Sequence, residues 1–416
     1  MNRTFNINEK ILLFLIFLIP IFGSIALGVI LFLSIILSIY FLFYKSSEIE
    51  IGPFKKIGLI FISYFIYYSI HGIFFTKSIL QHIHDIGKIF PILVFGVLAI
   101  LIKKDTIKVT HKALSYVAIL SIYFTIILAL IFRYCLPEII VLGETFTQKT
   151  GVMSRLEMGT GNALPFGTIF VTFAFMTCLD IQNKSLIEKI TSFSALILAV
   201  LIVAFWNGSR GPLLVTAPLI LLMFWFLYEK GKLSKNWVYL RSGVIAITVL
   251  VFLYSMIQSF GYDMSTNMAN GLKQIVVGGP KNNSVGIRLT LYQASLDAFS
   301  TRPFSGFGIG NIFESIVDFL PKSSKLQFSH VHNMFLNHLL AGGLFGLLFL
   351  FLLIFSPIIN LWGNSEKSST DDIYLSLIIT ITVLGTGMSN VLFLHDLLAG
   401  FFCVLIFLSS IAVHNK

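Results

Sequence analysis

Long apolar runs dominate this sequence and constrain its fold more than any other feature. A helix that crosses the hydrocarbon core of a bilayer needs about 20 predominantly apolar residues, because the core is roughly 30 Å thick. Such runs recur along most of the 416 residues, of which 56% are hydrophobic and 12% are charged. The mean hydropathy is +0.90. The chain therefore cannot be a soluble globular domain and is predicted to be an all-α polytopic membrane protein.

The apolar runs and the polar breaks between them predict about 12 transmembrane helices. The run from 11 to 44 is too long for one span, and we divide it at Pro20, Gly23 and Ser24 as a tight hairpin. It follows Arg3 and Lys10 without a small-residue cleavage site, so we interpret it as a retained anchor. The spans are expected near 11–25, 27–44, 57–76, 87–102, 113–134, 163–179, 190–206, 211–228, 242–259, 334–355, 373–390 and 397–413.

The distribution of lysine and arginine predicts the orientation. Basic residues in short loops are retained on the cytoplasmic side, and they concentrate in the loops that are cytoplasmic if the N-terminus lies inside. Both termini then face the cytoplasm. Residues 1–259 hold the first nine spans and 334–416 the last three, and the one large loop, 260–333, lies between spans 9 and 10 outside the cytoplasm.

The large loop is predicted to contain a helix. Gly261–Asn283 is polar and rich in Gly, Asn and Ser, which is typical of an irregular segment. Gly286–Ser300 has helical periodicity, with Ile287, Leu291, Ala294 and Ala298 on one face and Arg288, Tyr292 and Ser295 on another. Two interpretations are open. The helix lies on the membrane with a solvated Arg288, or Arg288 points at an anionic ligand held between helices.

A glycine-rich turn follows this helix, from Pro303 to Gly310. It superficially resembles a nucleotide-binding loop, but such motifs need a preceding strand in a βαβ unit, and nothing around the segment supplies one. We expect the glycines to let the backbone turn sharply and approach the membrane helices closely.

Polar residues stand at the ends of two spans. His330, His332 and Asn333 precede the span at 334–355, whose small residues at 341–343 and 346 favour close helix packing. Arg210 lies in the very short connection between spans seven and eight. Ionisable groups at membrane depth usually mark a functional cavity. The alternatives are an interfacial histidine with a satisfied hydrogen bond and a solvated tight turn around Arg210.

His332-Asn333, with Gly343 and Gly346 downstream, resembles the signature of the O-antigen ligase family, which includes related polysaccharide polymerases. Other segments match in order and topology. They are the turn Gly208-Ser209-Arg210, the helix start Gly286-Ile287-Arg288, the Pro303 to Gly310 turn, Arg155 before Gly159-Thr160-Gly161, and Lys88 at an early outer loop.

The resemblance implies a GT-C-like glycosyltransferase of the bacterial inner membrane with its site facing the periplasm. The donor would be a glycan on undecaprenyl diphosphate and the acceptor a lipid A-core sugar, with no cofactor or metal. Arg210 and Arg288 would stabilise the diphosphate, and His332 would be the general base of an inverting displacement. Substrate binding would involve Lys88, Arg155, His330 and Asn333.

Two other functions are considered. A polysaccharide polymerase of the same family would use the same kind of donor with another lipid-linked glycan as acceptor, and no residue separates it from a ligase. A transporter or lipid-linked glycan flippase could share the hydropathy profile. Transporters of this size often have two related halves, whereas this chain has its largest loop late and shows no repeated halves.

Overall fold

A computed structural model gives the fold of the protein. It describes residues 7–44, 54–75, 79–102, 109–134, 140–141, 144–145, 158–160, 162–207, 209–231, 284–321, 330–363 and 368–414. These residues form helices and short turns, apart from one antiparallel pair of two-residue strands, β1 (Ile140–Val141) and β2 (Glu144–Thr145). The predicted all-α class is confirmed for the described residues.

Helices occupy every predicted span that falls within the described residues, whereas 242–259 lies outside them. The helices are α1 (Ile7–Phe22), α2 (Ser24–Tyr44), α3 (Lys55–Phe75), α4 (Ile79–Leu101), α5 (His111–Tyr134), α6 (Ala163–Met176), α7 (Leu186–Leu201), α8 (Arg210–Gly231), α11 (Ser284–Thr301), α12 (Met334–Trp362), α13 (Thr370–Gly387) and α14 (Asp396–His414). A π-helical turn, Ile202–Asn207, extends α7.

Seven of the described helical segments are long and apolar enough to cross a membrane. They belong to α2, α3, α4, α5, α7 with its π-helical turn, α8 and α12, and two shorter apolar helices occur at Ala163–Met176 and Leu397–Ala412. The chain is thus a multi-pass membrane protein, and the number of about 12 spans stays a prediction.

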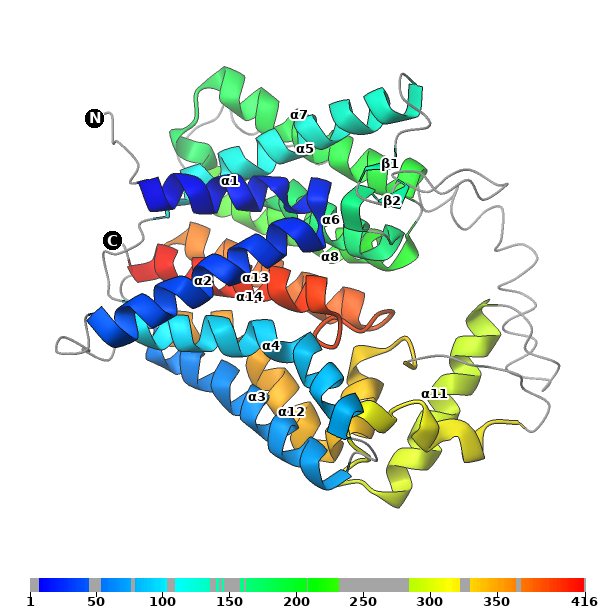
Figure 1. The fold of residues 1–416 in the computed structure, drawn as a ribbon. Coiled ribbons are helices and arrows are strands. Elements are labelled where there is room, and N and C mark those ends of the chain that lie inside the picture. The colour runs from blue at the N-terminus through cyan, green and yellow to red at the C-terminus, as the bar shows by residue number, and fades with distance from the viewer. Residues whose placement is uncertain are drawn as a thin grey trace.

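The predicted break in the first apolar run is confirmed. Gly23 separates α1 from α2 and has a φ of +49°, a left-handed conformation that glycine adopts without steric cost. The two helices form a V and pack against each other (Figure 1).

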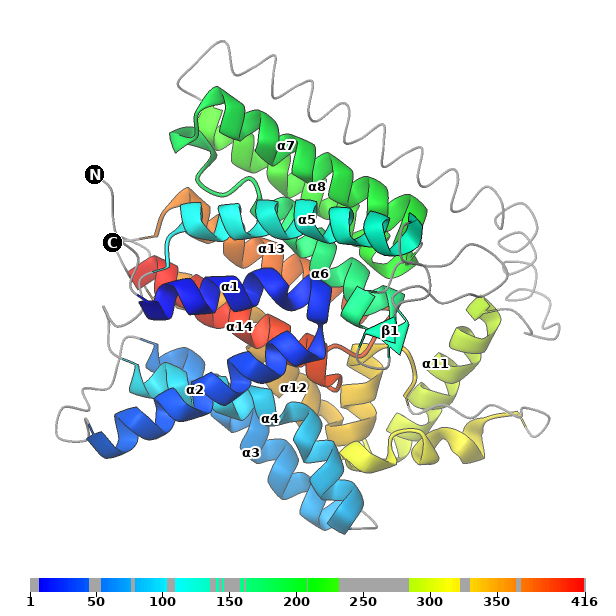
Figure 2. The same cartoon turned by 45° about the horizontal axis from the view of Figure 1, so that its top comes forward.

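Helix α14 forms the centre of the bundle. It is apolar on all sides, and nearly every described side chain from Leu397 to Ala412 is buried. It packs against α2, α4, α6, α12 and α13. Figure 2 shows α5, α7 and α8 along one flank and α2, α3 and α4 along the other. A helix that is hydrophobic all round is stable only when other helices enclose it.

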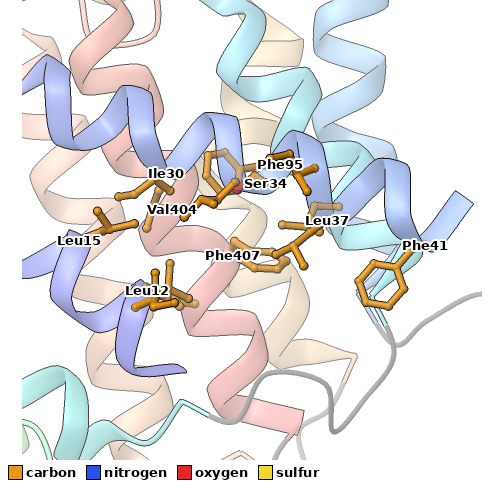
Figure 3. A pocket seen from close by; sticks show the side chains of 14 residues that line it. Leu12, Leu15, Ile30, Ser34, Leu37, Phe41, Phe95, Val404 and Phe407 are labelled. Atoms are coloured by element: carbon orange, nitrogen blue, oxygen red, sulfur yellow. The ribbon is translucent and has the colours of Figure 1, made fainter. Parts of the chain in front are cut away.

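An apolar cavity of about 160 Å³ lies between α1, α2, α4 and α14 (Figure 3). Leu12, Leu37, Phe95 and Phe407 are among its lining side chains, and Ser34 is the one polar residue in that lining. The rest of the lining is apolar. It offers no acid, base or cation, so the groups capable of chemistry lie elsewhere.

Contacts between charged and polar side chains stabilise one end of the bundle. Lys230 at the end of α8 lies 2.5 Å from Asp371 at the start of α13, and Asp371 also accepts a hydrogen bond of 2.8 Å from the backbone N–H of Asp180. His111 at the start of α5 lies 3.0 Å from Asp372. These contacts join helices from separate parts of the chain at the end where α1 begins and α14 ends, opposite α11 (Figure 1).

Helix α12 is broken in its middle. Gly343 has φ +61° and ψ −155°, so the helical hydrogen bonds are interrupted there. The carbonyls of Leu340 and Ala341 accept hydrogen bonds from the backbone N–H groups of Phe307 (2.7 Å) and Gly308 (2.9 Å) instead. In an apolar environment each unpaired backbone group costs several kcal/mol, so these replacements make the break tolerable.

The replacement donors belong to the glycine-rich turn after α11. Gly306 and Gly308 have φ of +65° and +94°, and a Cβ on Gly306 would lie 2.6 Å from the backbone N of Gly343. In the same turn, the carbonyl of Pro303 accepts a hydrogen bond of 2.9 Å from the backbone N–H of Leu344. The expected close approach of this turn to the membrane helices is confirmed.

Alanine at Gly343 should destabilise the fold. Its Cβ would collide with the carbonyl of Phe304, and the left-handed backbone is strained for alanine, so we expect a loss on the order of 2 kcal/mol or more. The matched control is Gly28→Ala in α2, where a Cβ meets nothing within 4 Å and alanine favours the helix. Thermal unfolding in detergent measures both variants. Equal melting temperatures would contradict the proposed fit of the turn to the break.

Candidate functional site

Helix α11 packs against the protein through the face predicted from its periodicity. Leu291, Ala294 and Ala298 are buried, and the helix contacts both α12 and the 3-10 helix Glu314–Phe319 (η7). On the predicted other face, Arg288 and Tyr292 are only partly buried, whereas Ser295 is fully buried. The apolar face thus rests on protein, and the arginine face is turned toward the residues that precede α12.

Asn333 begins α12 as its N-cap. Its side-chain oxygen accepts hydrogen bonds from the backbone N–H groups of Phe335 (3.0 Å) and Leu336 (3.1 Å), which the first helical turn would otherwise leave unpaired. Its amide nitrogen donates to the carbonyl of Met388, 3.4 Å away, just after α13. The described contacts of Asn333 are with backbone, and the substrate-binding role given to it stays a prediction.

His332 immediately precedes this cap and has a φ of +53°, which non-glycine residues rarely adopt. The hydroxyl of Tyr292 lies 3.2 Å from the carbonyl oxygens of both His332 and Met388 and donates to them. Helix α11, the start of α12 and the end of α13 therefore meet at Tyr292.

The surroundings of His332 favour its neutral form. Partial burial lowers the pKa of its imidazole below the ordinary value of 6.5, and the positive charge of Arg288 lowers it further. The imidazole is therefore uncharged at neutral pH, with a permanent cation nearby.

The ring of His330 is less suited than that of His332 to accept a proton. The two rings lie 4.3 Å apart edge to face, and Nδ1 of His330 accepts the backbone N–H of His332 at 3.2 Å. Burial lowers the pKa of His330 to about 4, with further lowering from His332, His395 and Lys88. Because Nδ1 is already an acceptor, His330 supports the backbone of His332 and is poorly suited to take a proton there.

Lys88 lies on α4, and its charge is felt by His330. It is held by Asp85, whose carboxylate oxygen lies 2.7 Å from the ammonium nitrogen one helical turn earlier, and its side chain is 39% exposed. The lysine is therefore a partly solvated cation at this end of the bundle.

Arg210 is the first residue of α8, as expected from the very short connection to the previous span. Asn207 orders this connection, since its amide donates to the carbonyl of Ala163 (2.6 Å) and its oxygen accepts the N–H of Ser209 (3.2 Å). A Cβ on the next residue, Gly211, would collide with the hydroxyl of Ser389. The start of α8 therefore lies beside the end of α13, next to the carbonyl that Tyr292 binds.

The side chain of Arg210 and the whole of Arg155 lie outside what the structure describes. The structure thus brings together Arg288, His332, His330, Asn333 and Lys88. For Arg210 it places the backbone at the same end.

Aromatic side chains of α3 support the first half of α12. The hydroxyl of Tyr67 donates to the carbonyl of Gly342 at 2.6 Å, one residue before the break. Tyr64 lies 2.8 Å from Nε2 of His338, whose Nδ1 is 2.7 Å from the carbonyl of Met334. These bonds fix the half-helix that carries Asn333 and His332 at its start.

Several of these residues were not singled out in the sequence. His395, Tyr64 and His338 lie in apolar runs, where the only signal is a polar side chain at membrane depth. Tyr292 was predicted to share a helix face with Arg288, one helical turn away, but no role was predicted for it.

The described part of the chain holds no group of three His, Cys, Asp or Glu residues that could bind a metal ion. What it does hold is a half-buried neutral imidazole, an arginine whose charge lowers the imidazole pKa, and the capped N-terminus of a helix. Such a set can bind an anion and accept a proton at the same pH.

Comparison with known proteins agrees with the motifs. A protein of Haemophilus influenzae described as uncharacterized is 25% identical over 331 residues, which cover 78% of this chain and 77% of that protein. Residues 194–351 match the family model described as "O-Antigen ligase". The matched segment contains Arg210, Arg288 and His332, and the family comprises membrane glycosyltransferase-like ligases and polymerases. Residues 194–351 of this chain are therefore similar to the O-antigen ligase family.

Proposed function

We propose that the protein is an O-antigen ligase of the bacterial inner membrane. It transfers a glycan from undecaprenyl diphosphate to a sugar of the lipid A-core, with its site facing the periplasm. The observation that carries this proposal is the position of His332 at the capped start of α12, near enough to Arg288 for the arginine charge to favour the uncharged imidazole. Similarity to the O-antigen ligase family over residues 194–351 supports the general class of substrates.

The donor diphosphate needs fixed positive charge. Arg288 and Arg210 are proposed to bind it bidentately and to stabilise the charge that develops as the glycosidic bond breaks. The N-termini of α8 and α12 both lie at this end, and helix N-termini favour anions. Lys88 and Arg155 are proposed as supporting cations, and His330 and Asn333 as further substrate-binding residues.

The acceptor hydroxyl needs a base. In the proposed step His332 takes the hydroxyl proton while the acceptor oxygen forms a bond to the anomeric carbon, and the carbon–oxygen bond to the diphosphate breaks with its electron pair on the leaving group. This single displacement inverts the anomeric carbon. The diphosphate is already an activated leaving group, so the proposed step uses no metal or nucleotide.

A polymerase of the same family remains the second candidate, because its donor chemistry is identical. A deletion strain separates the two functions. A ligase mutant accumulates lipid-linked polymer that does not reach the lipid A-core, whereas a polymerase mutant lacks long chains altogether.

The proposed topology predicts that residues 260–333 lie in the periplasm. A cysteine at Ser284, the first residue of α11, should react with an impermeant thiol reagent in intact spheroplasts. A cysteine at Asn183, in the 3-10 turn at the opposite end, serves as the control and should react only after lysis. The reverse pattern would overturn both the orientation and the proposed location of the chemistry.

Loss of His332 should abolish transfer. Removal of a general base typically lowers the rate by about two to four orders of magnitude. His332→Ala should therefore eliminate glycan ligation in cells while the protein accumulates normally. His330→Ala should have a much milder effect, because its ring contributes one hydrogen bond to the backbone. Comparable losses in both variants would argue against the distinct role of His332.

The pH dependence tests the base and Arg288 together. Because the pKa of His332 lies below its ordinary value, kcat/KM should fall only on the acidic side, as the imidazole becomes protonated below pH 6.5. Arg288→Gln removes the positive charge and should raise the pKa of His332. The acid limb of the profile, which is the fall of kcat/KM toward low pH, should then move to higher pH. Arg288→Lys keeps the charge and should leave the limb in place, although it loses bidentate binding and rate.

A purified enzyme, assayed with lipid-linked donor and acceptor from about pH 5 to 9, gives the profile. A rate that declines as the imidazole loses its proton would remove His332 from the role of base and leave it as a cationic ligand of the diphosphate.

A further inference from the structure

Tyr292 connects three segments that are distant in the sequence. Its ring projects from α11, and its hydroxyl lies 3.2 Å from the carbonyl of His332, before α12, and 3.2 Å from the carbonyl of Met388, after α13. No role in the proposed step has been given to it so far.

The backbone of His332 needs such a contact. Its φ of +53° is unfavourable for a residue with a Cβ, so the conformation persists only where neighbours impose it. On its N–H side His332 is held by the ring of His330 at 3.2 Å, and on its carbonyl side by the hydroxyl of Tyr292. Of these two contacts, only the second also reaches α11, the helix that carries Arg288.

We propose that Tyr292 is a positioning residue for the transfer reaction. Its hydroxyl holds His332 in the left-handed conformation and, through the same bond, fixes the approach of Arg288 to the imidazole. The proposal rests on the proposed function, in which the neutral His332 is the base. It goes beyond that function by assigning the geometry of the base to a residue that touches neither substrate nor the transferred proton.

The hydrogen bond from Tyr292 to the carbonyl of His332 is suited to positioning His332 and contributes little to the stability of the fold. Burial raises the pKa of the Tyr292 phenol, so the hydroxyl stays protonated as a donor throughout the neutral range. One hydroxyl proton is shared between two acceptors, and the side chain is only partly buried. Phenylalanine would keep the packing of the ring and remove only the hydrogen bonds.

Tyr292→Phe in the purified full-length enzyme tests the proposal. Misplacement of a catalytic group by about 1 Å can cost roughly 100-fold, so we expect kcat to fall by about 10- to 100-fold with an unchanged melting temperature. The acid limb of kcat/KM should move to higher pH, because the imidazole then lies farther from the positive charge of Arg288. In the double variant with Arg288→Gln, the limb should lie where Arg288→Gln alone puts it.

Tyr123→Phe is the matched control. Tyr123 on α5 also uses its hydroxyl for a helix-to-helix contact, with Ser194 at 2.5 Å, and α5 packs against α1, α6 and α7 but not against α11. This variant should keep both kcat and the acid limb.

The proposal would be overturned if Tyr292→Phe had the same kcat and the same acid limb of kcat/KM as the wild-type enzyme. Failure of that variant to accumulate would also overturn it, because the hydroxyl would then be needed for the fold itself. Absence of any acid limb in the wild-type enzyme would instead contradict the proposed base, which keeps the two failures distinguishable.

Discussion

The break in α12 and its repair by the turn at 303–308 are the constraint on which the rest of the structure depends. A helix interrupted among apolar neighbours must find new partners for its backbone, and two N–H groups of the turn, one carbonyl of the turn and the hydroxyl of Tyr67 provide them. The turn continues directly from α11. The same bonds that complete α12 therefore hold α11, with Arg288 and Tyr292, at the start of α12.

The site needs a permanent cation and an uncharged base close together, and it combines two residue types with very different pKa values. Arginine remains charged in any protein environment, whereas a histidine beside it loses its proton more readily. Partial burial acts in the same direction on the imidazole of His332. One small volume can therefore hold a cation for an anionic leaving group and an uncharged base for a hydroxyl.

Much of this arrangement could be predicted from the sequence, because it follows local rules. Apolar periodicity predicted the buried face of α11, and glycine density predicted the close turn. The break at Gly343 was not predicted, since a glycine in an apolar helix fits close packing equally well and the donors that permit a break lie 35 residues earlier at Gly308. The contacts of Tyr292 are to backbone carbonyls, which leave no mark on the sequence.

The order of elements along the chain has a consequence for biosynthesis. The turn that completes α12 is made before α12, and so is Tyr67 of α3. When the half-helix from Met334 to Gly342 leaves the ribosome, the donors for its exposed carbonyls already exist on the same polypeptide. Insertion of α12 can thus be accompanied by docking of the preceding turn.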